Sequence, residues 1–237
     1  VSNQKEIVEE LNIGSDSMVF FDDDPINREY MKKSIPEVLT PDIPNDSSQY
    51  AKILMEMNDF EILNITEEDT QRHTMYNEQR KRTEFQKQDA DFDEFLKQLN
   101  VSVNIKKADD FTIPRISQLT LKTNQFNLTT RRYQEEEIRK FAMDHKKIVR
   151  CAEIIDKFGN NGITGVYIVN KNNEKEWIID TFLLSCRVMS RGVEDGILSQ
   201  IIQKARNDGV KIIKGEFIPT KKNKPAENFY DKFGFKK

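Results

Sequence analysis

The stretch that decides the fold is Asn-Lys-Pro-Ala-Glu-Asn-Phe-Tyr-Asp-Lys-Phe-Gly-Phe, residues 223–235, near the C-terminal end of the chain. Its spacing predicts a short helix over residues 226–232, directly after a strand predicted for residues 211–217. A helix predicted for residues 192–207 precedes that strand and is closed by Gly209. The last unit is therefore expected to be a right-handed crossover onto a parallel strand.

Further upstream, the pattern alternates between strands and helices. Two apolar strands are expected around a four-residue hairpin turn at Gly159–Gly162, and a third strand follows them. The predicted elements of this region are a strand at 101–106, helices at 111–121 and 135–144, and strands at 147–158, 163–170 and 177–184. Together with the C-terminal elements they predict a domain over residues 101–237 of mixed α/β class (α+β mixed), with a mixed sheet whose central strands are antiparallel.

The first part of the chain has a different pattern. A helix at residues 3–12, a short buried strand at 17–21 and a helix beginning at Pro25 predict a piece of a parallel α/β sheet, residues 1–45. Three prolines make residues 36–48 an extended linker. Residues 46–100 are expected to be a helical arm, with a helix start at Thr66–Asp69 and a solvated helix of mixed charge after it. The chain opens directly on a helix, so we expect it to be the back half of a longer protein.

The composition excludes several classes of protein. Of the 237 residues, 37% are hydrophobic and 32% are charged, and the net charge is only −3. This balance predicts neither nucleic acid nor a membrane as a partner. Two cysteines are too few for a disulfide framework, and the cysteines and histidines lack zinc-site spacing. With no apolar signal-peptide core, we expect a cytoplasmic protein.

An acidic turn, Asp22-Asp23-Asp24-Pro25, follows the first predicted strand. Two aspartates at the carboxyl end of a strand make a hard-oxygen site suited to magnesium. The alternative is that the acids only cap the following helix, where negative charge is favoured. From physical chemistry alone, the two interpretations are equal.

Residues 223–235 resemble the closing helix of the GNAT acyltransferases, N-x-x-A-x-x-F-Y-x-x-x-G-F. The resemblance implies that Asn223 and Tyr230 flank a thioester and that the tyrosine hydroxyl protonates the departing thiolate. Alternatively, Tyr230 is a half-buried helix residue with its hydroxyl in solvent.

The GNAT turn that binds the pyrophosphate of CoA, Q/R-x-x-G-x-G/A, corresponds to residues 189–194. Arg191 and Gly192 match it, whereas Met189 and Glu194 depart from it. A glutamate facing a pyrophosphate repels it unless it folds back to cap the helix. The turn therefore disfavours CoA and is more compatible with the single phosphate of a phosphopantetheine thioester.

Several segments together resemble FkbH-like proteins over nearly the whole chain. They are FFDDDPINRE (20–29), ITEEDTQRHTMY (65–76), KTNQFNLTTRRY (122–133), DKFGNNG (156–162), DTFLLSCRVMSRGVE (180–194) and GEFIPTKKN (215–223). In that family a haloacid-dehalogenase (HAD) phosphatase domain precedes a GNAT-like half, and Asp22 and Asp23 match the HAD aspartate pair that helps to hold magnesium. No segment before residue 22 matches the motif that carries the HAD nucleophile, so no independent phosphatase activity is expected from this chain.

The FkbH-like resemblance implies acyl (glyceryl) transfer, from a small phosphorylated three-carbon acid onto an acyl carrier protein, in polyketide-type biosynthesis. The substrate or carrier contacts are expected at Asn124, Gln125, Asn127, Arg131 and Arg132, although a structural loop also uses such polar side chains. Cys186 lies beside Arg187 and the phosphate-like turn, where a lowered thiol pKa suits it to hold an acyl group. The alternative is a buried cysteine with a packing role. Two other functions stay open: an acetyl-CoA-dependent N- or O-acetyltransferase, and a non-catalytic docking domain for the carrier.

Overall fold

The computed structural model describes residues 2–11, 13–60, 70–88 and 91–236. The chain divides into two compact units, Val1–Ile65 and Thr66–Lys237, and each is described by itself. The predicted division into 1–45, 46–100 and 101–237 stays a prediction. The predicted helix start at Thr66–Asp69 lies outside the described residues.

The first unit is built from short helices: α1 (Ser2–Leu11), α2 (Pro25–Ser34), α3 (Tyr50–Glu56) and three single 3-10 turns. The strand expected at 17–21 is present only as a parallel bridge between Val19 and Leu39, and a 3-10 turn takes up Ser15–Ser17. A small apolar core of Met31, Ile35 and Val38 holds this unit together. Among its described residues no further strand extends the bridge, and an isolated strand pair is marginal in water.

The second unit contains a six-stranded sheet of β1 (Ser102–Lys107), β2 (Phe126–Asn127), β3 (Lys147–Asp156), β4 (Gly159–Asn173), β5 (Glu176–Leu184) and β6 (Ile212–Gly215). The strands β1, β3, β4 and β5 follow one another in antiparallel order. The other edge of β5 pairs in parallel with β6 over Glu176–Ile179, and antiparallel with β2 at Leu183 and Leu184. The predicted mixed sheet and the parallel last strand are confirmed.

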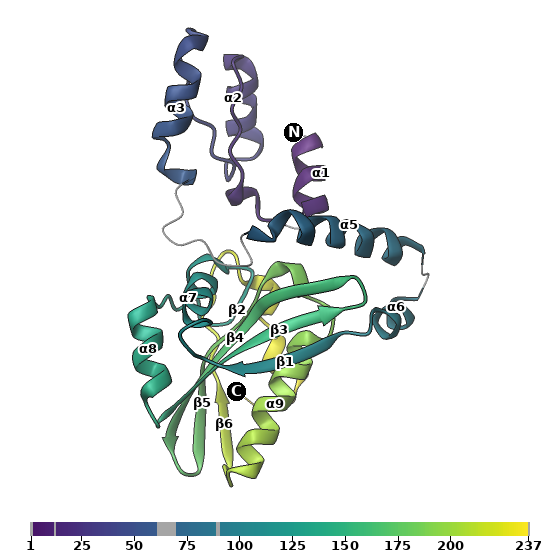
Figure 1. Ribbon diagram of the computed structural model, residues 1–237, viewed down its shortest axis with the longest axis vertical. Coiled ribbons are helices and arrows are strands. Elements are labelled where there is room, and N and C mark those ends of the chain that lie inside the picture. Colours follow the sequence, from purple (N-terminus) through teal and green to yellow (C-terminus); the bar gives the residue numbers. More distant parts are fainter. Residues whose placement is uncertain (1, 12, 61–69, 89–90, 237) are drawn as a thin grey trace. The chain divides into compact units, whose positions relative to one another are not determined.

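Helices cover both faces of this sheet (Figure 1). On one face, α7 (Ile113–Lys122) and α8 (Glu135–Met143) pack on an apolar cluster that includes Val149 and Cys151 of β3. On the other, α9 (Val193–Asn207) and α10 (Phe229–Lys232) pack on a cluster that includes Ile148 and Ala152. Burial on both faces explains why β3 and β4 are apolar runs and do not alternate with polar residues.

Three local predictions in this unit were wrong. The hairpin turn is Lys157–Phe158, because Asp156 already pairs with Gly159 and the predicted turn residues belong to β4. Residues 126–127, expected in a loop, form β2. The C-terminal helix begins at Phe229, after a 3-10 turn at Lys224–Ala226. Two further helices, α5 (Arg72–Gln88) and α6 (Phe92–Leu99), belong to the same unit.

Candidate functional site

Tyr230 lies on α10 with 8% of its surface exposed. Its ring lies against the backbone of Gly215, at the end of β6, so closely that a Cβ there would come within 2.5–2.7 Å of three ring atoms. Its hydroxyl is buried and bonds to no side chain among the described residues, while the backbone N–H of Glu216 interacts with it. Burial, and secondarily the charge of Glu216, raises the pKa of this hydroxyl well above its ordinary value and outweighs the opposing effect of that N–H. Tyr230 therefore keeps its proton at physiological pH.

Asn223 is fully buried and its side chain is committed to structural bonds. Its Nδ2 donates to the carbonyls of Asn127 and Ile218, both at 2.9 Å, and its Oδ1 accepts from the backbone amide of Thr220 at 2.7 Å. The amide thus ties the segment before α10 to β2. It has no remaining N–H to offer to a ligand.

The segment from Phe126 to Arg131 covers the last part of the β5 edge. Leu128 donates its backbone N–H to Phe182 at 3.1 Å, and the Thr129 hydroxyl donates to the carbonyl of Asp180 at 2.8 Å. The backbone N–H of Ile218 in turn donates to Leu128 at 2.8 Å. The chain's own backbone therefore stands between the end of β5 and the chain that follows β6.

Charged side chains gather beside this segment. Arg131 donates to the carboxylate of Asp180 at 2.9 Å and to that of Glu216 at 2.8 Å. The Tyr133 hydroxyl donates to the other Asp180 oxygen at 2.8 Å, and burial followed by this bond raises the pKa of Tyr133. Arg131 thus links Asp180 of β5 to Glu216. Glu216 follows β6 and lies beside Tyr230.

The other predicted substrate contacts are structural or exposed. Asn127 is buried, with its Oδ1 accepting from the Thr130 amide at 2.9 Å. Arg132 donates to the carbonyl of Thr123 at 3.1 Å at the end of α7, and to Asn124 at 2.5 Å. Gln125 is exposed. The substrate role of these residues stays a prediction.

The turn before α9 has the backbone but not the charge that an anion site needs. Gly192 has φ +73° and open space where a Cβ would stand, so a ligand could approach its backbone. The guanidinium of Arg191 is directed to Asp156 at 3.3 Å and to Gln79 of α5 at 2.7 Å. Burial, followed by the neighbouring Arg82, lowers the pKa of Arg191 to about 10.

Glu194, in the first turn of α9, has one buried carboxylate oxygen without a partner among the described residues. Burial raises the pKa of this carboxyl, and the backbone amides of Glu194 and Ser190 partly offset that effect. The side chain is therefore folded toward the helix N-terminus, where an anionic ligand would otherwise sit. With Arg191 turned away, the turn does not fit the pyrophosphate of CoA.

Cys186 begins the single 3-10 turn Cys186–Val188, between β5 and Gly192. The prediction that its thiol pKa is lowered was wrong, because burial raises that pKa and outweighs the opposing charge of Arg187. Cys151 is buried in β3, where burial raises its pKa to about 11. Both thiols are thus mainly protonated at neutral pH.

The acidic turn of the first unit acts as a helix cap. Asp24 accepts from the Ile26 amide at 2.8 Å, with Pro25 as the first helical residue. Asp22 accepts from the Asp24 amide at 2.9 Å and from Asn27 at 3.3 Å, and Asp23 lies beside it in the turn. Within the described ranges, no group of three acidic, histidine or cysteine residues could hold a metal ion. The magnesium role of Asp22 and Asp23 stays a prediction.

Two buried acids were missed by the sequence analysis. The Asp156 carboxylate accepts two hydrogen bonds from Arg82 of α5, at 2.7 and 2.9 Å. The Asp180 carboxylate accepts hydrogen bonds from Arg131 and Tyr133. The available signal was a lone acid in an apolar strand, as in Trp-Ile-Ile-Asp-Thr-Phe, residues 177–182. A charged residue at such a position requires a buried partner.

Over part of its length, the chain is similar in structure to several solved proteins, acetyltransferases among them. The ribosomal-protein-S18-alanine N-acetyltransferase of Escherichia coli is 12% identical, with a TM-score of 0.44 over 57% of this chain and 78% of that one. A GNAT family acetyltransferase of Elizabethkingia anophelis, solved with acetyl-CoA bound, is 16% identical with a TM-score of 0.38 over 58% and 76%. A domain from Methanocaldococcus jannaschii is 13% identical with a TM-score of 0.47 over 58% and 90%.

Neither a protein-family model nor a curated relative matches the chain. Similarities of this size identify neither an activity nor a substrate. In the part of the chain that the structure describes, no helix is long and apolar enough to cross a membrane.

Proposed function

We propose that residues 101–237 form a GNAT-type acyltransferase domain that removes an acyl group from a thioester. The observation that carries the proposal is the buried, protonated hydroxyl of Tyr230 beside Gly215, which bonds to no side chain among the described residues. The parallel pair of β5 and β6, joined through α9, supports it, because α9 begins at the Arg191-Gly192 turn of the motif.

The proposed role of Tyr230 is that of the acid. When a second thiol or water attacks a thioester carbonyl, it forms the new bond to carbon and releases its proton to solvent. The bond between carbon and the first sulfur breaks, and that sulfur leaves with the electron pair as a thiolate. Tyr230 holds a proton on Oη that it can donate to that sulfur, and solvent then returns a proton to Tyr230. Arg131 positions Glu216 next to this tyrosine, and Asn223 anchors the chain that leads into α10.

The proposed partner is the phosphopantetheine thiol of an acyl carrier protein, which receives the acyl group or hands it over as a thioester, with CoA disfavoured. Glu194 and the inward direction of Arg191 argue against a pyrophosphate at the turn. The FkbH-like resemblance supports a glyceryl group derived from a phosphorylated three-carbon acid. The same resemblance supports a magnesium-binding role for Asp22 and Asp23 as part of a HAD domain.

A specific observation favours a second candidate, a non-catalytic docking domain for the carrier. Residues 126–131 cover the end of the β5 edge, and Asn223 and Arg131 are fully engaged in structural bonds. A domain that only binds a carrier needs none of these groups for chemistry.

The test is to incubate the full chain with a glyceryl-loaded acyl carrier protein, or with acetyl-CoA, and to follow loss of the acyl group by mass spectrometry. We expect loss from the carrier, about 100-fold slower with Tyr230→Phe. The matched control is Tyr30→Phe, which removes the hydroxyl of an exposed tyrosine in the first unit.

Carrier binding without acyl loss, equal in the parent and in Tyr230→Phe, supports the docking domain. Consumption of acetyl-CoA with tight CoA binding overturns the assignment of the donor.

A further inference from the structure

Two segments near the Tyr230 site contain no acidic residue. They are residues 118–134, which run from α7 through β2, and residues 217–226, which lie between β6 and α10. Together they hold six lysines and arginines, in a chain whose acids outnumber its bases by 40 to 37. This local excess of positive charge runs against the net charge of −3 of the whole chain.

Hydrogen bonds join the two segments to each other. The buried side chain of Asn223 donates to the carbonyl of Asn127 at 2.9 Å, and the side chain of Asn127 donates in turn to the carbonyl of Thr123 at 3.2 Å. That same Thr123 carbonyl accepts from Arg132 at 3.1 Å. Three consecutive hydrogen bonds thus connect the loop before α10, past β2, with the end of α7 (Figure 1).

Four cations of these segments stay uncompensated. The side chains of Lys122, Lys221 and Lys224 are exposed and make no ion pair among the described residues. Arg132 is also exposed, and it donates only to neutral oxygens, those of two backbone carbonyls and one side-chain amide. We call these four residues the basic face. Glu227, an exposed acid that directly follows the second segment, offsets one of these charges at most.

The acids that contact the two segments do not cancel the basic face. Arg131 binds the carboxylate of Asp180 at 2.9 Å and that of Glu216 at 2.8 Å. Both carboxylates are therefore already neutralised by Arg131, which is not counted in the basic face.

The loop that carries Lys221 and Lys224 is held in one conformation. Asn223 lies between these lysines and is fully buried. Its side chain donates to the carbonyl of Ile218 at 2.9 Å and accepts from the amide of Thr220 at 2.7 Å. A loop that is fixed in advance loses little conformational freedom when a partner binds.

The basic face borders the proposed catalytic site. The loop 217–226 begins directly after Glu216, whose backbone N–H interacts with the Tyr230 hydroxyl, and it leads into α10. Each segment also exposes a large apolar side chain, Leu121 at 39% and Ile218 at 38%. Apolar contacts within a polar, charged rim are typical of interfaces between proteins, whereas nucleic acid is held mainly through its phosphates.

We propose that the basic face docks a negatively charged face of a protein partner. This inference rests on the proposed function for the identity of that partner, the acyl carrier protein. Complementary charges steer such an encounter and fix its orientation. A carrier held on Lys221 and Lys224 lies beside the loop that connects Glu216 to the helix of Tyr230, where its thioester is needed.

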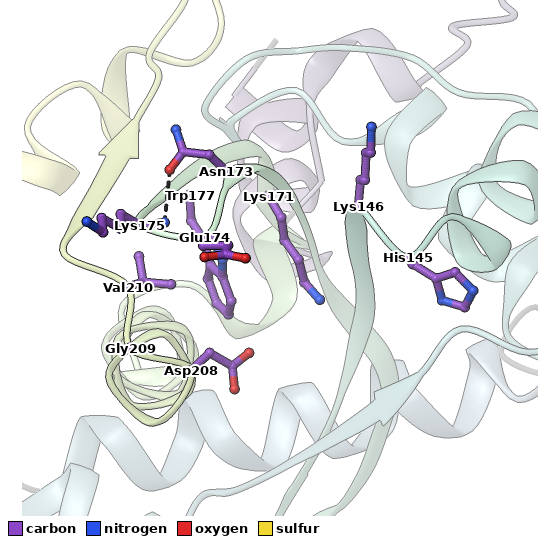
Figure 2. Close-up of a pocket in the computed structure, with 10 residues that line it drawn as sticks. All are labelled: His145, Lys146, Lys171, Asn173, Glu174, Lys175, Trp177, Asp208, Gly209 and Val210. Carbon is purple, nitrogen blue, oxygen red and sulfur yellow. Dashed lines mark hydrogen bonds between the residues drawn. The ribbon is translucent and has the colours of Figure 1, made fainter.

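Another group of lysines supplies a matched control. Lys146, Lys171 and Lys175 line a hollow near the start of β5, but their side chains point away from one another, and Glu174 and Asp208 line the hollow as well (Figure 2). Lys175 is exposed. Lys175→Glu therefore changes the net charge of the chain by the same amount as a basic-face variant, at a surface of mixed sign.

The first measurement is calorimetric titration of the full chain with an acyl carrier protein of acidic isoelectric point that lacks its phosphopantetheine arm, so that no reaction contributes. Lys122→Glu, and the double variant Lys221→Glu with Lys224→Glu, should each raise the Kd about tenfold at low salt, because repulsion replaces attraction. Lys175→Glu should leave the Kd as in the parent. These differences should become small at about 0.5 M salt, which screens exposed charges.

Acyl loss from the loaded carrier separates this inference from the proposed reaction. The basic-face variants should raise KM and leave kcat unchanged, whereas Tyr230→Phe should lower kcat. Weaker binding by the basic-face variants, with no acyl loss even in the parent, supports the docking surface and refutes the reaction. Acyl loss with the same Kd in the basic-face variants as in Lys175→Glu overturns the docking surface alone. Absence of carrier binding, or binding of a single-stranded oligonucleotide in its place, also overturns it.

Discussion

The buried ion pair between Arg82 and Asp156 provides a sharp test of the structure. The side chains are 3% and 0% exposed, and Arg82 donates two hydrogen bonds to the carboxylate at 2.7 and 2.9 Å. Arg191 shares the same carboxylate at 3.3 Å. Asp156→Asn removes the negative charge but keeps the shape of the side chain. Arg82 and Arg191 then stay buried without this carboxylate.

Breaking a buried pair in this way costs about 3–5 kcal/mol, because the desolvated partner charge stays buried. We therefore expect the free energy of unfolding to fall by that amount in urea at pH 7. Amide hydrogen exchange of α5 should accelerate as well, because Arg82 holds α5 to the β3–β4 hairpin. The matched control is Asp208→Asn, whose exposed pair with Lys204 four residues earlier contributes about 0.3–0.5 kcal/mol.

The pH dependence has a defined sign. Burial alone raises the pKa of Asp156, but the bonds from Arg82, Phe158 and Asn161 outweigh burial and leave this pKa below 3.8. The stabilisation is then fully present above the ordinary carboxyl pKa and is lost as the pH falls through the folded value. The difference in free energy of unfolding between the parent and Asp156→Asn should therefore become smaller below about pH 4. If Asp156→Asn lowers the free energy of unfolding by less than about 1 kcal/mol at pH 7, as Asp208→Asn should, the buried ion pair is refuted.

Three further predictions concern the candidate site. Tyr230→Phe should change the unfolding free energy by less than about 1 kcal/mol, because the buried hydroxyl bonds to no side chain and interacts only with the backbone N–H of Glu216; urea unfolding measures this, and a large loss would contradict the geometry. Gly215→Ala should destabilise the protein by about 1–3 kcal/mol in the same assay, since its Cβ would meet the Tyr230 ring, and an unchanged midpoint would place the ring elsewhere. The rate of Cys186 alkylation by iodoacetamide should have its pH midpoint above 9, because burial raises the thiol pKa. The alkylation lost in Cys186→Ser is the part that belongs to this thiol, and a midpoint below 8 would support the original prediction of a reactive cysteine.

Much of the fold could be predicted because its signals are local. Gly192 and Gly209 mark the two ends of α9, with φ of +73° and +75°, and Asp24 with Pro25 begins α2. Such signals depend on backbone torsions and on hydrogen bonds between near neighbours, which a few residues determine. The apolar runs of β3 and β4 likewise indicated strands, although their burial on both faces was seen only in the structure.

The candidate site was less predictable, because its chemistry depends on where side chains point. The resemblance placed Tyr230 beside a thioester and Arg191 in a phosphate-binding turn, but the direction of Arg191 depends on Asp156 and on Gln79, 112 residues earlier in the chain. The pairing of β2 with β5 joins residues 56 and 58 positions apart, and the bond from Asn223 to Asn127 joins residues 96 positions apart.

The sequence by itself determined the order of helices and strands in the second unit apart from β2, the parallel last strand and the backbone of the turn before α9. Tertiary structure alone decided which polar side chains stay available for chemistry. A polar group that becomes buried must find partners from whichever segments the packed sheet brings close, and periodicity along the chain carries no record of that choice. Arg191, Asn223 and Arg131 therefore hold structural bonds, while the hydroxyl of Tyr230 bonds to no side chain among the described residues.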